Sequence, residues 1–126
     1  MHRSRLGTLI IDCQSDNLRA DAEFWSAALG CEAEPADNQK DLKYIRLGND
    51  SPDVQVLLQQ VDHPSRVHID IETDDIEAEV ERLQRIGATL VERLPRWVVL
   101  EAPSGHRFCV IGPVRDGFAE NANRWN

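Results

Sequence analysis

Hydrophobic and polar positions along the chain follow one pattern twice. Each copy opens with an apolar run rich in strand formers, Leu9–Asp12 in the first and Val67–Asp70 in the second. An amphipathic stretch of helical period follows each run, and a glycine, Gly30 or Gly87, ends it. The spacing between the two openings and the spacing between the two glycines agree to within one residue. The chain is therefore predicted to contain an internal structural repeat.

The first copy has the pattern of one strand, one helix and three further strands. Residues 6–13 are rich in β-formers, and Asp16 is a candidate N-cap for a helix that ends at Gly30. Three short strand patterns follow, separated by turn-forming residues. These strand patterns cover residues 31–34, 42–47 and 54–61.

The second copy repeats this order. A strand at 66–72 precedes a helix for which Thr73 or Asp74 is the candidate N-cap, and Gly87 ends the helix. Strand patterns follow at 89–94, 97–101 and 107–111. Each copy is therefore predicted to be a βαβββ module, and the fold class is α+β.

The two modules fit one domain of ordinary size. A chain of 126 residues is long enough to bury a core without disulfides. We predict a single domain over residues 1–112, with one module at about 6–61 and the other at about 66–112. The polar residues 113–126 lose the periodicity and are predicted to form a C-terminal tail.

Charge and cysteine content restrict the classes of partner. The chain has 22 acidic and 14 basic residues, a net charge of −8, and the acidic residues are spread along it. This charge argues against nucleic acid as a partner. No apolar run approaches the roughly 20 residues of a membrane span, and the first residues do not resemble a signal segment, so a cytoplasmic location is expected. Cys13, Cys31 and Cys109 are widely spaced and are expected to be reduced thiols.

Several motifs occur in a fixed order over residues 6–112. They are Phe24–Gly30, Val67–Ile71, a Glu-rich helix that leads into Ile86–Ala88, and Trp97–Leu100 followed by Pro103–Val110. Together they resemble the glyoxalase/bleomycin-resistance/extradiol-dioxygenase superfamily, also called vicinal oxygen chelate, in its glyoxalase-like branch. The resemblance implies two βαβββ modules whose sheets curve into a cup, with helices outside and a small-molecule ligand inside. It also implies a homodimer.

Strand alternation separates two faces of the strand at 66–72. The apolar Val67, Ile69 and Ile71 are expected to face the helix, which leaves His68 and Asp70 on the opposite face. By the resemblance, that opposite face lines the cup. The repeat then places Ile10 and Asp12 of the first copy in matching cup positions.

The resemblance also indicates where a metal would bind. In metal-using members the first and last strands of the modules supply the ligands, and these positions fall here at Ile10, His68, Gln59 and Cys109. Only His68 is a typical ligand, because isoleucine cannot coordinate, a glutamine oxygen is weak and a cysteine suits soft metals. We therefore expect no resident cofactor. His68, Gln59 and Cys109 are weak candidates for a divalent metal.

His68 has two interpretations. It is a catalytic group that acts as a general base or binds a substrate carbonyl, or it is a remnant of an ancestral ligand that neighbouring groups satisfy. His68 and Asp70 also resemble half of a facial iron triad, but no other histidine obviously completes it. Asp12 occupies the place of Asp70 in a copy without a histidine, which favours an architectural role for this aspartate.

Three further residues are candidates for substrate binding. Cys109 is either a nucleophile paired with His68 or a thiol that only packs. Trp97 stacks on a flat ligand or packs between modules. Arg107 binds an anionic group or is a surface arginine among many acids.

The functional hypothesis is a glyoxalase-like protein with a degraded metal site that binds or transforms a small organic molecule in the cup. One alternative is a metal-dependent lyase, isomerase or dioxygenase that acts on a carbonyl or enolate-forming substrate. Another is a drug-sequestering binding protein of the bleomycin-resistance type, and a third is a regulatory or structural module whose own side chains fill the cup.

Overall fold

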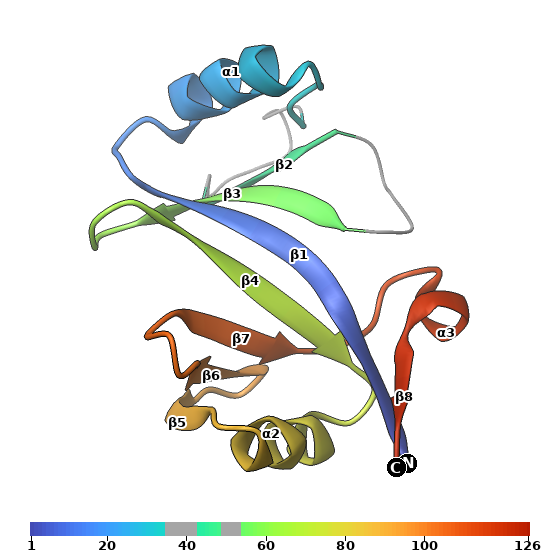
Figure 1. The fold of residues 1–126 in the computed structure, drawn as a ribbon. Helices are drawn as coiled ribbons and strands as arrows, with labels where there is room; N and C mark the ends of the chain where they lie inside the picture. Colours follow the sequence, from blue (N-terminus) through green and yellow to red (C-terminus); the bar gives the residue numbers. More distant parts are fainter. Residues whose placement is uncertain (35–42, 49–53) are drawn as a thin grey trace. The chain divides into compact units, whose positions relative to one another are not determined.

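The described part of the chain forms strands and three helices in two compact units (Figure 1). The structure is a computed structural model that describes residues 1–34, 43–48 and 54–126. Unit 1 comprises Met1–Thr8 and His68–Asn126, and unit 2 comprises Leu9–Val67. The helices and strands confirm the expected α+β class. None of the described helices is long and apolar enough to cross a membrane.

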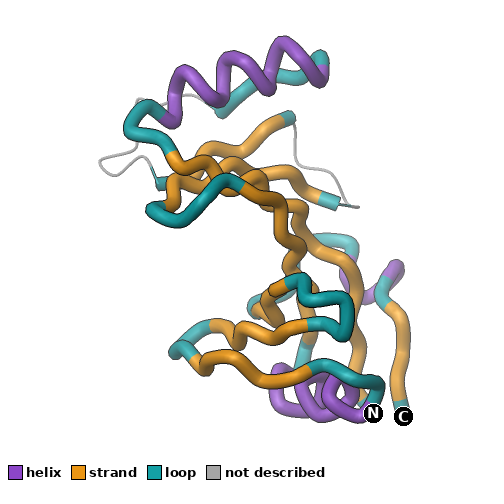
Figure 2. The backbone as a smooth tube through the Cα atoms, turned by 60° about the vertical axis from the view of Figure 1, so that its left-hand side comes forward, coloured by secondary structure: helices purple, strands orange, loops and turns teal. Residues whose placement is uncertain are grey.

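Unit 2 contains one helix on a small sheet. Its strands are hydrogen-bonded in the order β2-β3-β1, and α1 packs on β2 and β3 (Figure 2). The bounds are β1 His2–Gln14, α1 Leu18–Leu29, β2 Tyr44–Leu47 and β3 Gln55–Val61. The core of unit 2 consists of Ile11, Cys13, Leu18, Ala22, Ile45, Leu47 and Leu58.

Local sequence signals explain most of unit 2. The helix α1 begins at Asn17, not at Asp16, because the Asn17 side chain accepts a hydrogen bond from the Ala20 N–H. Gly30 ends the helix with φ 71°, a left-handed conformation that glycine tolerates. The strand expected at 31–34 is reduced to one bridge between Ala33 and Leu47, and residue 42, where the next strand was expected to start, lies outside the described residues.

Unit 1 contains the second repeat. Its strands follow the order β4-β7-β6-β5, with β4 and β7 parallel and the other two pairs antiparallel, and α2 packs on β6 and β7. The bounds are β4 Arg66–Thr73, α2 Ile76–Arg85, β5 Thr89–Arg93, β6 Trp97–Glu101 and β7 Arg107–Ile111. The core of unit 1 consists of Val80, Leu83, Val98, Leu100, Phe108 and Val110.

Two expectations for this repeat need correction. Asp75 is the N-cap of α2, because its carboxylate accepts a hydrogen bond from the Ala78 N–H. Ile71 packs against the core as expected, but Val67 is 53% exposed and Ile69 is 38% exposed. The helix α2 packs on β6 and β7, so the first half of β4 has no helix over it.

Residues 113–126 contain two further elements, α3 (Phe118–Asn121) and β8 (Asn123–Trp125). Strand β8 pairs with the start of β1, where Trp125 lies opposite His2, so the two chain ends are neighbours (Figure 1). Phe118 is 3% exposed. The polar pattern of this segment gave no sign of either element.

Candidate functional site

The sheet of unit 1 has one apolar face and one mixed face. In the parallel pair, Asp70 of β4 lies opposite Cys109 of β7, and Cys109 lies opposite Val99 of β6. Because side chains alternate along a strand, the apolar Val98 and Val110 take the other face, toward α2. We call the mixed face the site face. It carries His68, Asp70, Trp97, Val99, Arg107 and Cys109.

Three side chains converge at the centre of the site face. The His68 Nε2 atom lies 3.4 Å from the Asp70 Oδ1 atom, and one donor atom each from His68, Asp70 and Cys109 lie within 4.8 Å of one another. The His68 and Asp70 side chains are only 13% and 15% exposed. The Oδ1 atom of Asp70 is buried and has no hydrogen-bond partner among the described residues. The cluster therefore holds a desolvated carboxylate oxygen that can still accept a bond.

The cysteines differ in their surroundings. Cys109 and Cys31 are free thiols that are partly exposed, whereas Cys13 is buried. Burial raises the pKa of the Cys13 thiol, and the nearby carboxylates of Asp21 and Asp12 raise it further. Cys13 is thus a poor nucleophile, and Cys109 is the thiol that lies beside a histidine and a carboxylate.

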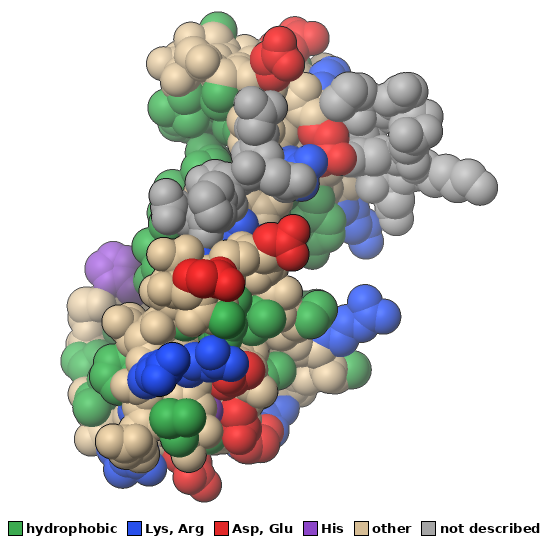
Figure 3. All heavy atoms as spheres, turned by 90° about the vertical axis from the view of Figure 1, so that its right-hand side faces the viewer, with side chains coloured by type: hydrophobic (Ala, Val, Ile, Leu, Met, Phe, Trp, Pro, Cys, Tyr) green, Lys and Arg blue, Asp and Glu red, His purple; other side chains and the backbone are tan. Residues whose placement is uncertain are grey.

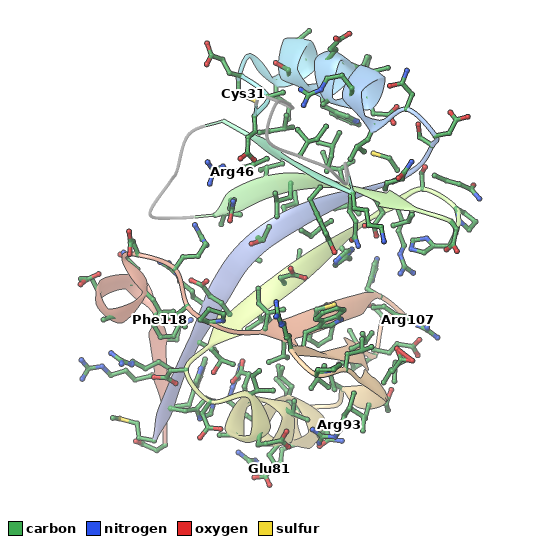
Figure 4. The ribbon with its side chains drawn as sticks, turned by 180° about the vertical axis from the view of Figure 1, so that it is seen from behind. Cys31, Arg46, Glu81, Arg93, Arg107 and Phe118 are labelled. Atoms are coloured by element: carbon green, nitrogen blue, oxygen red, sulfur yellow. The ribbon has the colours of Figure 1, made fainter. Side chains whose placement is uncertain are left out.

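Trp97 and Arg107 lie on the site face on either side of Cys109. Trp97 is 37% exposed and pairs with Ile111. Arg107 lies at the start of β7 (Figure 4), and its Nε atom is 3.6 Å from Glu101 Oε1. The arginine is half exposed, so this surface ion pair contributes little to stability. Both residues are in place to contact a ligand that covers the cluster.

The other candidate residues belong to unit 2. Ile10 is 3% exposed and Asp12 is 2% exposed. The Asp12 Oδ2 atom lies 3.5 Å from Arg66 Nε, and Gln59 Nε2 donates a hydrogen bond of 3.2 Å to the Tyr44 hydroxyl. The structure thus brings His68, Asp70 and Cys109 together in one unit, while the roles of Ile10, Asp12 and Gln59 stay predictions.

Unit 2 has a cleft of its own, with a volume of about 650 Å³. It lies between the loop before α1 and the end of β3, and Gln60 Nε2 donates a hydrogen bond of 2.7 Å to the Ser15 carbonyl at its edge. The lining residues are Ser15, Asp16, Lys43, Tyr44, Gln59, Gln60, Val61, Asp62 and His63. Sequence reasoning singled out Gln59 but not the cleft, because turns from distant parts of the chain form it.

Unit 1 also contains two buried carboxylates whose partners sequence reasoning did not predict. Glu72 is 1% exposed, with Arg5 Nε at 2.5 Å and Arg115 Nε at 3.5 Å. Glu79 is fully buried and accepts hydrogen bonds from His2 and Arg82, each at 2.8 Å. The partner residues come from the chain ends, or, for Arg82, from the next helical turn. These clusters attach β1 and residues 113–126 to the repeat and are structural.

Burial raises the pKa of the Glu79 carboxyl, but hydrogen bonds from Arg82, His2 and Ser4 outweigh burial. The net effect lowers the pKa of Glu79 below its ordinary value.

The surface itself carries both signs of charge, since acidic and basic side chains are interspersed among the described residues of the face in Figure 3.

The donor set of the site face fits a divalent ion of borderline softness. An imidazole nitrogen, a thiolate sulfur and a carboxylate oxygen are the ligand types of zinc. The buried Asp70 Oδ1 atom, which lacks a hydrogen-bond partner among the described residues, is the observation that favours such a ligand. Oxygen-preferring ions such as Mg²⁺ fit the thiol and the imidazole poorly.

Comparisons with known proteins agree with the fold. A family model described as "Glyoxalase-like domain" matches residues 8–111. A hypothetical protein from Bacillus halodurans has a TM-score of 0.63 at 12% identity, covering 90% of this chain and 96% of that chain. The methylmalonyl-CoA epimerase of Streptomyces coelicolor, in complex with 2-nitronate-propionyl-CoA, has a TM-score of 0.58 at 20% identity, covering 88% and 98%.

The methylmalonyl-CoA epimerase of Mycobacterium tuberculosis has a TM-score of 0.55 at 16% identity, covering 87% of this chain and 88% of that chain. No curated protein sequence matches the chain. At these identities the similar structures establish the fold and not the activity. Because the family model spans most of the chain and agrees with the repeated modules, the chain belongs to the glyoxalase-like domain family of the vicinal oxygen chelate superfamily.

Proposed function

We propose that the protein binds a small organic molecule with a carbonyl group against the site face of unit 1 and transforms it, with His68 as the central residue. The observation that carries this proposal is the convergence of His68, Asp70 and Cys109, whose donor atoms lie within 4.8 Å of one another in a partly buried position. Clusters of this kind are typical of binding and catalytic sites.

The chemistry of His68 suits this role. An imidazole both donates and accepts hydrogen bonds, so His68 can hold a carbonyl oxygen or exchange a proton with the carbon beside it. Asp70 Oδ1, at 3.4 Å from His68 Nε2, places a carboxylate beside the ring. Because the His68 side chain is only 13% exposed, water competes weakly for these bonds.

Neighbouring side chains define the rest of the ligand. Trp97 offers an apolar ring surface to a flat or hydrophobic part, and Arg107 offers a cation to a carboxylate or phosphate. A carbonyl compound with an anionic group, such as a 2-oxo acid or an acyl thioester, fits this combination. The similar fold of an epimerase that holds a CoA derivative supports an acyl thioester as the first compound to test.

A ligand screen by thermal unfolding tests the proposal. The panel contains 2-oxo acids, aldehydes, acyl-CoA thioesters and a cationic glycopeptide drug. A ligand at 100 times its Kd stabilises the folded state by about 2.7 kcal/mol. Stabilisation is expected in the wild type and in His63→Ala, a control in an exposed loop, and it is expected to vanish in His68→Ala.

Mass spectrometry of the ligand after incubation in D₂O then separates an enzyme from a binding protein, because an isomerase that exchanges a proton leaves deuterium in the ligand. A changed ligand supports a lyase, isomerase or oxygenase, and an unchanged one supports sequestration of the drug-binding type. Stabilisation that is fully retained in His68→Ala would contradict the role of His68, and stabilisation by the glycopeptide alone would contradict the carbonyl ligand.

A further inference from the structure

We propose that the cleft of unit 2 binds a small zwitterion, with a free amino acid as the class of ligand. Unit 2 alone forms this cleft, and none of its lining residues belongs to the site face. The proposal therefore goes beyond the proposed function and does not rest on it. The residues that recognise the two charges of the ligand are Lys43, Asp16 and Asp62, which all line the cleft.

The strand order separates charges of opposite sign across the cleft. Strand β3 lies between β2 and β1 (Figure 1). Lys43 directly precedes β2 on one side of β3, and Asp16 follows β1 on the other side. Asp62 follows β3 itself. The cleft thus has a cation at one side and carboxylates at its middle and far side, and this arrangement complements a ligand that carries both a carboxylate and an ammonium group.

The three charged groups are available to a ligand. Lys43, Asp16 and Asp62 are exposed, and their side chains make no hydrogen bond or ion pair with any of the described residues. A ligand that binds them replaces water and breaks no ion pair of the protein. Each contact would be a hydrogen bond between two charged groups, which is stronger than one between neutral groups.

Tyr44 adds a hydroxyl donor and an apolar surface to the cleft. Its oxygen accepts a hydrogen bond of 3.2 Å from Gln59 Nε2, so the hydroxyl proton remains for an acceptor on the ligand. The Tyr44 residue is 48% exposed, which leaves part of the ring open to contact. An amino acid with an apolar or aromatic side chain can pack against this ring. Tyr44 therefore favours such an amino acid over a fully polar zwitterion.

Hydrogen bonds hold the walls of the cleft together. The Gln60 side chain donates a bond of 2.7 Å to the Ser15 carbonyl, and the Gln60 backbone N–H donates one of 2.8 Å to the Lys43 carbonyl. Gln14 Nε2 donates a bond of 3.1 Å to the Asp62 carbonyl. The backbone at or beside each charged residue is thus fixed before a ligand binds, and this preorganisation reduces the entropy lost on binding.

The test is an NMR titration of ¹⁵N-labelled full-length protein with L-phenylalanine and L-leucine. Phenethylamine and hydrocinnamate serve as matched ligands, because each keeps the aromatic group and one of the two charges. For an open cleft and a ligand of this size we expect a Kd on the order of 1 mM. L-phenylalanine should shift the backbone amides of the lining residues, and each analogue with a single charge should bind about tenfold more weakly.

Neutral variants identify the groups that recognise the ligand. Lys43→Gln removes the cation and should weaken binding of L-phenylalanine about tenfold, whereas Lys43→Arg should keep it. Because Asp16 and Asp62 can each accept from the ammonium group, the double variant D16N/D62N tests the carboxylates and should cause a similar loss. Glu23→Gln is the control, since Glu23 is an exposed acid of unit 2 outside the cleft. The spectrum without ligand verifies that each variant is folded.

The outcomes separate this proposal from the proposed function. Absence of shifts with both amino acids, shifts confined to unit 1, or equal binding of the analogues with a single charge would overturn the amino-acid site. Wild-type affinity in Lys43→Gln or in D16N/D62N would overturn it as well. His68→Ala should bind L-phenylalanine as the wild type does. A protein that binds L-phenylalanine in this way but responds to no compound of the carbonyl panel would contradict only the proposed function.

Discussion

Replacement of Glu79 by alanine should destabilise the protein far more than replacement of an exposed acid on the same helix. Glu79 is fully buried, and its two carboxylate oxygens accept hydrogen bonds from His2 Nε2 and from Arg82 Nε and Nη2, each at 2.8 Å. Removal of the carboxylate leaves both donors in a poorly hydrated position. Breaking a buried ion pair in this way costs about 3–5 kcal/mol.

The structure places the expected value within this range. The Arg82 side chain is 19% exposed and stacks on the Trp125 ring at 3.8 Å, so it keeps one favourable contact and reaches some water. His2 is 8% exposed and does not recover its bond. We therefore expect a loss near the lower limit, about 3 kcal/mol. Glu79→Gln keeps the volume and one acceptor oxygen and should cost about half as much.

Urea unfolding followed by circular dichroism measures both losses, with Glu77→Ala as the control. Glu77 is on the same helix and its carboxylate is 2.6 Å from Arg93 Nη1, but the pair is largely exposed and should contribute less than about 1 kcal/mol. Because the folded state lowers the pKa of Glu79, its contribution is complete above the ordinary carboxyl pKa and is lost as the pH falls through the lowered value. Equal losses in Glu79→Ala and Glu77→Ala at neutral pH would refute this reasoning.

Three further predictions concern close packing and the thiols. Gly7→Ala should destabilise the fold by about 1–3 kcal/mol in thermal unfolding, because the new Cβ would lie 3.0 Å from Glu72 Cγ. An unchanged stability would show that the Glu72 side chain can move. Phe118→Ala should cost about 3–5 kcal/mol in urea unfolding, since this ring is buried; a loss below 1 kcal/mol would mean that residues 113–126 add little to stability. Cys13 should react with iodoacetamide more slowly than Cys31 at neutral pH, and its rate should increase as the pH rises toward its raised pKa. Peptide mass spectrometry measures both rates, and equal rates would contradict the burial of Cys13.

Periodicity was sufficient to predict the repeated elements. Each helix follows an apolar stripe that begins near an Asn or Asp cap and is followed by a glycine. The glycines were the expected ends, and α1 and α2 end within one residue of them. The caps themselves are displaced by one residue, to Asn17 and Asp75, because several adjacent polar residues are equally able to cap. The strand expected at 31–34 shows the opposite case, in which a pattern of four residues was too short to establish a strand.

Long-range pairing could not be predicted from the pattern. Strand β8 is polar, and only its register with β1 and the hydrogen bond from the Trp125 indole to the Ser4 hydroxyl give it a place. Glu79 looks like any other acid of a charged helix, and its burial depends on His2 of a distant strand. Alternation did predict that His68 and Asp70 share a face. Their proximity to Cys109 required the parallel register of β4 and β7.

The internal repeat supplies a comparison for the role of Asp70. Asp12 and Asp70 occupy matching positions, so an architectural role would predict similar partners for both. Asp12 is 2% exposed and its Oδ2 atom faces the guanidinium of Arg66 at 3.5 Å. The position that corresponds to Arg66 in the first copy holds Thr8, which carries no charge. The Asp70 Oδ1 atom lies 3.4 Å from His68 Nε2.

The two aspartates therefore face different side chains, an arginine in the first copy and a histidine in the second. The same asymmetry separates Ile10 from His68, since the copy whose aspartate faces the arginine is also the copy without the histidine. In the ligand screen, Asp70→Asn should therefore weaken the stabilisation by a ligand and Asp12→Asn should keep it. An equal loss in both variants would show that the two aspartates share one structural role.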